Sequence, residues 1–470
     1  GFMKSGAGAL VLSNANVYAG PTIVSNGTLR LMSSSNGLYE GRLDGAWDTT
    51  TANPATSIVS TVRMGNTNGK PPWGDNETWV YTGYINNLDS TNVTWTFAEN
   101  IDDAASIRID GNLLWANSGG WNNPTRADYI LTPGYHSVEI RMGNGAGGAG
   151  YSNQGWLNNN LGLCYDPQGR AADNPAFYQV MTDPGDGSLF SLSNGTILPR
   201  NTALSVASGT VVDFNGSAHA LGSLSDYGGG GGLVTNSAGW MIKLAVGSDD
   251  TSTTFSGVIG GSISLAKIGS GTLALSGSNT YIGATIVNQG VLDIIQSDSI
   301  GYSSALTVNP GALARIIQSS DQALGCALTG ANGTIIKAGA ARLTITSSNS
   351  TYTGSIIVSN GTLAVSTSGT IGSTNIILET NTMLVIETSA GSVIGDTANV
   401  DLKSGSPNGK IYLTNGAFEV VGSLSFDGAP QSLGTYGATG SGAAYIDDSR
   451  FEGSGILLVG SGTDSWGPDA

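Results

Sequence analysis

One sequence pattern occurs three times in this chain, at residues 4–31, 267–294 and 337–365. Each copy opens with a lysine, reaches a tyrosine 14 or 15 residues later, and closes on a leucine 11 residues after that tyrosine. A unit of about 28 residues cannot bury a hydrophobic core alone, but stacked units can. The repeat therefore restricts the chain to architectures in which similar units lie side by side.

Within a copy, apolar and polar residues alternate in short segments, as at Leu273 and Leu275. Such segments, separated by Ser, Asn, Gly and Thr, predict β-strands joined by tight turns. Asn-Gly or Gln-Gly pairs at 26–27, 289–290 and 360–361 supply the turn glycines, because glycine adopts positive φ without steric cost. Helical spacing of apolar residues is missing, so the sequence predicts an all-β chain.

For the repeat-bearing regions we expect a right-handed parallel β-helix, a solenoid with roughly 20 residues per coil. A sandwich made of hairpins is the alternative. The solenoid is favoured because the strands recur as one repeated pattern rather than as independent hairpins. In a solenoid, the repeated tyrosines (Tyr18, Tyr281 and Tyr352) would stack on one another or fill the same corner of the coils.

The motif K-x-G-x-G-x-L-x-L-x-G, then N-x-Y-x-G and x-x-G-x-L, runs from Lys267 to Leu292. It resembles the autotransporter-associated β-strand repeat of bacterial surface proteins. The stretch 434–459 is similar to the closing segment of long secreted members. The resemblance covers 1–34 and about 190–460. It implies a secreted β-helical passenger or surface protein, and it implies no reaction.

The composition and net charge limit the classes of molecule that the chain can bind. Hydrophobic residues make up 39% of the chain and charged residues only 11%, which is too apolar for disorder. The net charge of −16 argues against nucleic acid and anionic membranes, since both attract basic patches. No run of 18 apolar residues occurs, so we expect no membrane insertion. The chain opens in the middle of a repeat and reads as a mature chain or a fragment.

The region after the first repeat differs in composition. Seven of the nine tryptophans fall between Trp47 and Trp156, and the repeat resumes only near Ser191. Short strands are expected at 79–85, 92–99, 106–115 and 135–142, which is typical of an antiparallel β-sandwich. We therefore expect a first β-helix segment at 1–35, an inserted sandwich at 36–188, the main β-helix at 189–460 and a tail at 461–470.

Three elements of the insertion carry a second resemblance: the pair Asp102-Asp103, the turn 109–111 and the segment 131–136. They resemble the protective-antigen-type lectin domain of toxins, glycosidases and yeast flocculins. The resemblance implies that Asp102 and Asp103 hold a Ca²⁺, which in turn binds neighbouring sugar hydroxyls. Calcium takes six to eight oxygen ligands, so a diol can join carboxylates around it. The alternative is a structural aspartate pair without metal.

The loop 143–160 is the candidate second side of this site, with Asn144 and Asn153 as ligands for the cation or the sugar. Trp121 and Trp156 lie among glycines and asparagines, and we expect them to stack on sugar rings, whose C–H faces suit aromatic surfaces. Trp115 is a weaker candidate of the same kind. For each tryptophan the alternative is packing within the sandwich or against the solenoid.

Catalytic motifs are missing. The chain has no nucleophile elbow, phosphate loop or Cys/His metal spacing, and its aspartates show no repeated register. His219, in a Gly-Ser-rich stretch, is expected to be solvent-exposed. Two cysteines, Cys164 and Cys326, are too few for a disulfide framework, and buried free thiols are preferred over a bridge between domains.

The sequence thus predicts a non-enzymatic extracellular surface protein whose β-helix displays a lectin-like domain for adhesion or matrix building. Unpaired strands at the coil ends would allow head-to-tail self-association into a filament. One alternative is a glycan-binding module of a polysaccharide-degrading system. Another is a β-helix polysaccharide lyase or hydrolase.

Overall fold

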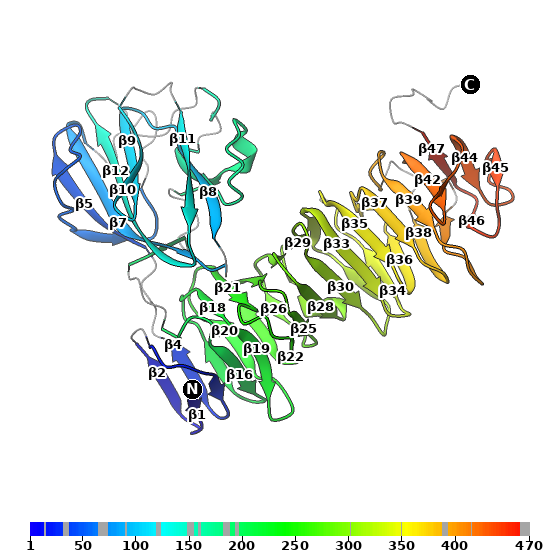
Figure 1. The fold of residues 1–470 in the computed structure, drawn as a ribbon, viewed down its shortest axis with the longest axis horizontal. Helices are drawn as coiled ribbons and strands as arrows, with labels where there is room; N and C mark the ends of the chain where they lie inside the picture. Colours follow the sequence, from blue (N-terminus) through cyan, green and yellow to red (C-terminus); the bar gives the residue numbers. More distant parts are fainter. Residues whose placement is uncertain are drawn as a thin grey trace.

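The computed structural model describes residues 1–13, 16–31, 37–63, 74–89, 92–118, 124–147, 155–157, 161–181, 189–192, 197–300, 302–348, 350–387, 393–414 and 416–460. These residues form β-strands and a few 3-10 turns, such as η1 (Pro175–Phe177) and η3 (Ser297–Ile300), and no α-helix is found among them. The prediction of an all-β solenoid with an antiparallel sandwich is confirmed (Figure 1).

Most strands belong to a solenoid in which three successive strands of a coil lie in three different sheets. The strand order of the first sheet is β1 (Phe2–Lys4), β3 (Thr22–Val24), β16 (Ala203–Ala207), β19 (Ser223–Tyr227). The strand order of the second sheet is β2 (Ala9–Leu12), β4 (Thr28–Leu31), β17 (Val211–Asp213), β20 (Leu233–Asn236), β23 (Val258–Gly261), β26 (Thr280–Tyr281). The third has the order β18 (His219–Leu221), β21 (Ile242–Val246), β24 (Ile263–Lys267), β27 (Thr285–Val287), β29 (Ala305–Val308), β32 (Ala327–Thr329).

The solenoid continues towards the carboxyl end in three further sheets. The longest has the order β22 (Thr253–Phe255), β25 (Thr272–Leu275), β28 (Val291–Ile295), β30 (Leu313–Ile317), β33 (Ala331–Ala338), β35 (Thr353–Val358), β37 (Asn375–Leu378), β39 (Asn399–Leu402), β42 (Ser423–Phe426), β43 (Ala429–Pro430). The second of these sheets has the order β31 (Gln322–Leu324), β34 (Arg342–Ile345), β36 (Gly361–Val365), β38 (Thr382–Ile386), β40 (Lys410–Leu413), β46 (Phe451–Gly453). The third has the order β41 (Phe418–Val421), β47 (Ile456–Val459), β44 (Gly434–Gly437), β45 (Tyr445–Ile446).

Neighbouring coils pair in parallel, with partners about one expected coil length apart. Leu204 lies opposite Leu224, and Leu244 lies opposite Leu265. Inward residues therefore stack in ladders, since residues in register point to the same side of a sheet. One such ladder contains Leu273, Leu292, Ala314, Ile335, Ile356, Ile376, Val400 and Leu424.

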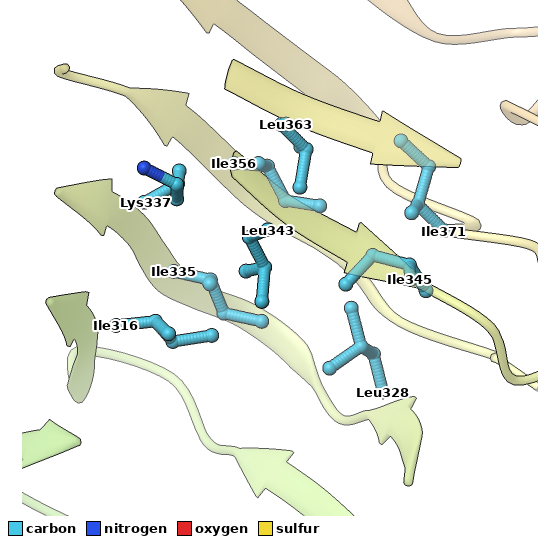
Figure 2. A pocket seen from close by; sticks show the side chains of 9 residues that line it. All are labelled: Ile316, Leu328, Ile335, Lys337, Leu343, Ile345, Ile356, Leu363 and Ile371. Atoms are coloured by element: carbon cyan, nitrogen blue, oxygen red, sulfur yellow. The ribbon is translucent and has the colours of Figure 1, made fainter. Parts of the chain in front are cut away.

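The interior of the coils is closely packed. Figure 2 shows nine side chains, among them Leu343, Ile345 and Ile356, gathered around a void of about 10 Å³. Such a void leaves room for one water at most, and its apolar lining gives a water no partners. The solenoid interior is therefore structural core rather than a ligand cavity.

Each copy of the repeat pairs with itself. The first two strands of each copy lie beside its last two strands, with equivalent partners in all three copies. These are Lys4 opposite Val24 and Leu10 opposite Leu29, Lys267 opposite Val287 and Leu273 opposite Leu292, and Lys337 opposite Val358 and Leu343 opposite Leu363. The pattern is longer than one coil because it contains a full coil and also the strands of the next coil that pair with its first strands.

The lysine that opens each copy is buried and binds backbone carbonyls. Lys267 Nζ donates to the carbonyl oxygens of Ile268 at 2.6 Å, Gly269 at 2.7 Å and Gln289 at 3.2 Å. Lys337 makes the equivalent three bonds. Gln289 precedes the turn glycine of the same copy, so the lysine joins the first turn of the copy to its last. Burial lowers the pKa of the Lys267 amine to about 8.

The repeated tyrosines of the second and third copies are also buried. Tyr281 and Tyr352 lie in the solenoid core, and Tyr281 Oη is 2.6 Å from Thr285 Oγ1. In the first copy Tyr18 is half-buried and contacts Thr22 in the same way. The structure therefore places this tyrosine against the core in two copies and at its margin in the first; that it stacks or fills one corner of the coils stays a prediction.

His219 corrects the sequence analysis, which placed it in a solvent-exposed turn. It lies in β18 with only 1% of its surface exposed, and its ring centroid is 5.3 Å from that of Phe214. Its neighbours in register, Leu244 and Leu265, are core leucines. Burial lowers the pKa of His219 from 6.5 to about 3, so the imidazole is neutral at physiological pH.

Both cysteines are buried free thiols, as preferred from the sequence. Cys164 lies in the sandwich and Cys326 in the solenoid core. Burial raises the pKa of Cys326 to about 11 and that of Cys164 well above its usual value. Thiolates are the reactive form, so both groups are inert packing residues.

Between β4 and β16 the chain forms two facing antiparallel sheets. The larger has the order β10 (Asn112–Asn117), β9 (Ala104–Ile109), β12 (Gly134–Asn144), β7 (Glu77–Asn87), β5 (Leu38–Asp44), β6 (Ser57–Val59), with β15 (Phe190–Ser191) also on β7. The smaller has the order β11 (Thr125–Leu131), β8 (Val93–Glu99), β13 (Leu163–Asp166), β14 (Gln179–Val180). Their core includes Tyr81, Phe97, Ile107, Trp115 and Ile140.

The sandwich interrupts two coils that are direct neighbours. Val24 of β3 lies opposite Val206 of β16, and Leu29 of β4 lies opposite Val212 of β17. The parallel pairing of neighbouring coils therefore continues across the insertion without a gap. The expected boundaries at 35/36 and at 188, and the tail at 461–470, fall on residues outside the described ranges.

The sandwich docks on the outer face of the solenoid (Figure 1). Leu88 packs on a ladder of three small residues in register, Ala220, Ala245 and Ala266. Arg200 of the solenoid donates to the backbone oxygens of Asn87 at 3.0 Å and Asp89 at 2.5 Å. These contacts combine apolar packing with a partly buried cation, and they fix the sandwich on the solenoid.

Candidate functional site

The pair Asp102-Asp103 lies in the turn between β8 and β9, at one end of the sandwich. Asp103 has a positive φ of 69°, a conformation that aspartate tolerates better than most residues. Its Oδ2 accepts a hydrogen bond from the Gly145 backbone at 2.6 Å. The pair is therefore tied to the loop after β12, which the sequence analysis proposed as the second side of the site.

Asn144 precedes that glycine and is buried, with 1% of its surface exposed. Its Nδ2 donates to the Gly74 carbonyl at 2.8 Å, but its Oδ1 is buried and has no hydrogen-bond partner. A buried carbonyl oxygen without a partner costs free energy on the order of 1–3 kcal/mol. A cation is one partner that would satisfy this oxygen.

A third segment, missed by the sequence analysis, completes this end of the sandwich. Asp75 Oδ1 accepts from the Gly147 backbone at 3.2 Å, and the Asn76 backbone donates to the Gly145 carbonyl at 2.9 Å. The segment 74–76 carries no motif, and its position follows only from the pairing of β7 with β12. Hydrogen bonds thus join the segment 74–76, the turn that carries Asp103 and the loop after β12.

The turn that carries the aspartate pair rests on buried polar groups. Glu99 Oε1 accepts from Asn117 Nδ2 at 2.7 Å, and Glu99 Oε2 accepts from the Ile101 backbone at 2.9 Å. Asn100 Nδ2 donates to the Leu157 carbonyl at 2.6 Å. These bonds fix the chain just before the aspartate pair.

The electrostatics at this end favour a cation. Burial, and then the neighbouring charge of Asp103, raise the pKa of Asp102, and a cation bound here would oppose both effects. Among the described residues, no three His, Cys, Asp or Glu side chains cluster closely enough to hold a metal. A Ca²⁺ here would thus need amide or backbone carbonyl oxygens, such as Asn144 Oδ1, alongside the two aspartates.

The predicted aromatic platforms lie in different settings. Trp156 is half-buried, with its ring 5.6 Å from Tyr178 and 5.1 Å from the Arg126 guanidinium. Trp115 is a core residue whose Nε1 donates to the Phe97 carbonyl at 3.2 Å. Trp121 and Asn153 lie outside the described residues.

The remaining elements of the second resemblance form a structural corner. Asp110 turns β9 into β10, and its Oδ2 lies 2.6 Å from His136 Nδ1, while its Oδ1 accepts from the Ser137 backbone at 2.9 Å. Although partial burial opposes it, hydrogen bonding to His136 lowers the pKa of Asp110. This corner joins three strands and lies apart from the aspartate pair.

Comparison with known proteins identifies the repeat. The passenger-associated-transport-repeat family model matches residues 2–31, 265–294 and 335–365, which are the three copies found in the sequence. The resemblance to autotransporter-associated repeats is confirmed. Over 399 residues the chain is 26% identical to the adhesin BmaC autotransporter of Brucella suis biovar 1 (strain 1330), a match that covers 75% of this chain and 11% of that protein.

Two alpha-agarases match shorter parts of the chain. The enzyme of Thalassotalea agarivorans is 35% identical over 114 residues, or 24% of this chain and 7% of that protein. That of Alteromonas agarilytica is 34% identical over 122 residues, or 25% of this chain and 8% of that protein. The chain therefore spans between 7% and 11% of the length of these relatives.

Solved structures give weaker matches. The PA14 domain of the MpAFP antifreeze protein matches 34% of this chain and 93% of its own, with 13% identity and a TM-score of 0.23. An anti-sigma factor domain-containing protein matches 36% of this chain and 51% of its own, with 16% identity and a TM-score of 0.26. These scores are too low to support a conclusion on function. Across the described residues, no helix has the length and apolar character needed to span a bilayer.

Proposed function

We propose that this chain is part of a non-enzymatic extracellular surface protein, whose β-solenoid carries a sandwich domain that binds glycans in adhesion. The similarity to an autotransporter adhesin and the three transport-associated repeats support a location on the cell surface. A solenoid suits display, because an insertion between two coils leaves the rest of the stack unchanged.

The observation that carries the glycan site is the buried Asn144 Oδ1 beside the Asp102-Asp103 turn. In this proposal the two carboxylates and the unpaired amide oxygen supply part of a calcium shell, and sugar hydroxyls supply further oxygens. In this proposal Asp102 and Asp103 bind the cation, and Asn144 binds it from the opposite loop. Trp156, Trp121 and Asn153 stay candidates for contact with the sugar.

The Asp103→Asn variant tests the site. Asparagine tolerates the positive φ and still accepts the Gly145 hydrogen bond, so the turn should fold. We expect calorimetric titration with CaCl₂ to show at least tenfold weaker binding, because one charged ligand is lost. The affinity of the unmutated protein should fall on acidification, since Asp102 with its raised pKa takes up a proton in competition with the cation.

Asp396→Asn, on an exposed loop of the solenoid, is the matched control and should leave calcium binding unchanged. A glycan array is then read with CaCl₂ and with chelator. Sugars held only with calcium, and lost in Asp103→Asn, would support the proposal. If no sugar binds under either condition, the lectin assignment is wrong.

A second candidate is a glycan-capture module within a polysaccharide-degrading system. The matches to two alpha-agarases favour it, because about a quarter of this chain is similar to part of each of those enzymes. Agarose oligosaccharides are therefore the first ligands to test. Binding without any release of reducing ends would support a module that captures glycans and does not cleave them.

Self-association into filaments stays a prediction. At the carboxyl end of the described solenoid, β43 and β44 lie antiparallel on β42 and β47, so part of that edge is already covered. A second copy would have to contact these short strands. Electron microscopy over a range of protein concentrations should show fibres if the prediction holds, and dispersed particles at all concentrations would contradict it.

A further inference from the structure

We propose that a groove on the outer face of the larger sandwich sheet is a second carbohydrate site, which binds an uncharged polysaccharide chain without a metal ion. The inference goes beyond the function proposed above, because the groove contains no residue of the calcium site. It lies over β5, β7, β12 and β9 and has a volume of about 380 Å³. Small-molecule sites in proteins fall in the same size range.

The floor of the groove contains a row of four side chains from four neighbouring strands. Tyr39 lies opposite Thr82, Thr82 opposite Glu139, and Glu139 opposite Arg108. Adjacent strands are about 4.8 Å apart, so the row is roughly 14 Å long. This length suits an extended chain of sugar rings rather than a single compact ligand.

The lining has the chemistry that sugars need. Tyr39 is 40% exposed, and Tyr84 stands edge-on to Tyr135 with ring centroids 6.4 Å apart. Tyrosine rings offer apolar faces to sugar C–H groups and a hydroxyl at the rim. Thr82 and the exposed Ser137 add hydroxyls beside them, so aromatic and polar contacts alternate along the groove.

The loop 48–53 is tied to residues that line the groove. Asn53 Nδ2 donates to the Tyr39 carbonyl and to Thr82 Oγ1, both at 2.9 Å. Arg141 donates to the backbone oxygens of Asp48 at 3.0 Å and Thr51 at 2.8 Å. A site that is ordered before binding loses less conformational entropy when its ligand arrives.

The charges in the groove are balanced. Arg108 Nε lies 3.6 Å from Glu139 Oε1, and Arg141 Nε donates to the same oxygen at 2.8 Å. Arg141 itself is buried, which leaves Arg108 as the accessible cation beside a carboxylate. With a net charge of −16, the chain repels anionic polymers. An uncharged polysaccharide fits these conditions better than an acidic one.

A peptide fits the groove poorly. The four strands of the floor are internal to the sheet, since β9 is covered by β10 and β5 by β6. Their backbone groups are therefore paired on both sides, and an added strand would find no free edge. Recognition has to come from the side chains alone.

The test uses the full chain in the presence of a chelator, so that binding at the proposed calcium site does not contribute. Arrays of uncharged and acidic oligosaccharides identify ligands, and calorimetry then measures their affinities. We expect uncharged oligosaccharides to bind and Tyr39→Ala to weaken them at least about tenfold, because a stacking face is lost. Tyr39→Phe keeps the ring and should bind within about threefold of the unmutated protein.

Tyr302→Ala is the matched control, because this solenoid tyrosine is 67% exposed and lies outside the groove. Hydrogen exchange supplies a readout that needs no variant: a bound ligand should protect peptides that contain β5 and β12. The proposal is overturned if no uncharged sugar binds in chelator, if Tyr39→Ala binds normally, or if only peptides or acidic sugars bind.

Discussion

His219→Leu is expected to make the solenoid markedly more resistant to acid. In the folded protein the imidazole is buried beside Phe214, its Nε2 has no hydrogen-bond partner, and its pKa is about 3 instead of 6.5. Between pH 6.5 and about pH 3, His219 is therefore mostly protonated in the unfolded chain and mostly neutral in the folded chain. Because the folded pKa is depressed, stability is complete above pH 6.5 and falls as the pH drops towards 3.

The size of this effect follows from the pKa difference. Each pH unit between the two pKa values costs about 1.4 kcal/mol, so at pH 4.5 this histidine removes roughly 3 kcal/mol. Leucine is a conservative replacement, because the register partners Leu244 and Leu265 already form a leucine ladder at this position. The change should therefore cost little at neutral pH.

Urea unfolding at pH 7.5 and pH 4.5 measures the effect. The free energy of unfolding of His219→Leu, relative to the unmutated protein, should rise by roughly 3 kcal/mol between the two pH values. Protonation of carboxylates is common to both proteins and cancels in this difference. His136→Gln, which removes the other histidine of the chain, should not reproduce the gain. Equal acid sensitivity of His219→Leu and the unmutated protein would contradict the assignment.

The repeat predicted the solenoid because its pattern is a local property of the chain. Alternation within a strand and glycine at a turn are visible in a short stretch of sequence. The burial of His219 was missed because Gly, Ser and Ala around it resemble a turn. Only the pairing of coils about 20 residues apart shows that it occupies the place of Leu244 and Leu265.

The same reasoning separates the two proposed carbohydrate sites. Asp102 and Asp103 were found from sequence because adjacent aspartates before a strand form part of a recognisable motif. Asp75 has no such context and reaches the site only through strand pairing. The row from Tyr39 to Arg108 combines positions far apart in the chain, and no local pattern marks it. Sites assembled by register across a sheet are therefore the least visible in a sequence.

Gly290→Ala is expected to destabilise the second repeat copy far more than a comparable change elsewhere. Gly290 has φ of +68°, and a Cβ on it would lie 2.4 Å from the Gly269 carbonyl oxygen and 2.6 Å from that of Gly271. Both contacts are with backbone, and Gly269 O also accepts from Lys267 Nζ, so a shift there would disturb the buried lysine. We expect a loss of roughly 3–5 kcal/mol from backbone strain and overlap together.

Gly311→Ala separates the two contributions. Gly311 has φ of +77°, but a Cβ there meets nothing within 4 Å, so its cost should be only the backbone strain of about 1 kcal/mol. Hydrogen exchange of peptides covering β25 and β28 reads the local stability, since a solenoid opens coil by coil rather than all at once. Exchange in Gly290→Ala should accelerate far more than in Gly311→Ala. Gly27, Gly290 and Gly361 occupy the same turn in the three copies. If both variants have equal effects, close backbone packing at this turn is not the reason why each copy has glycine there.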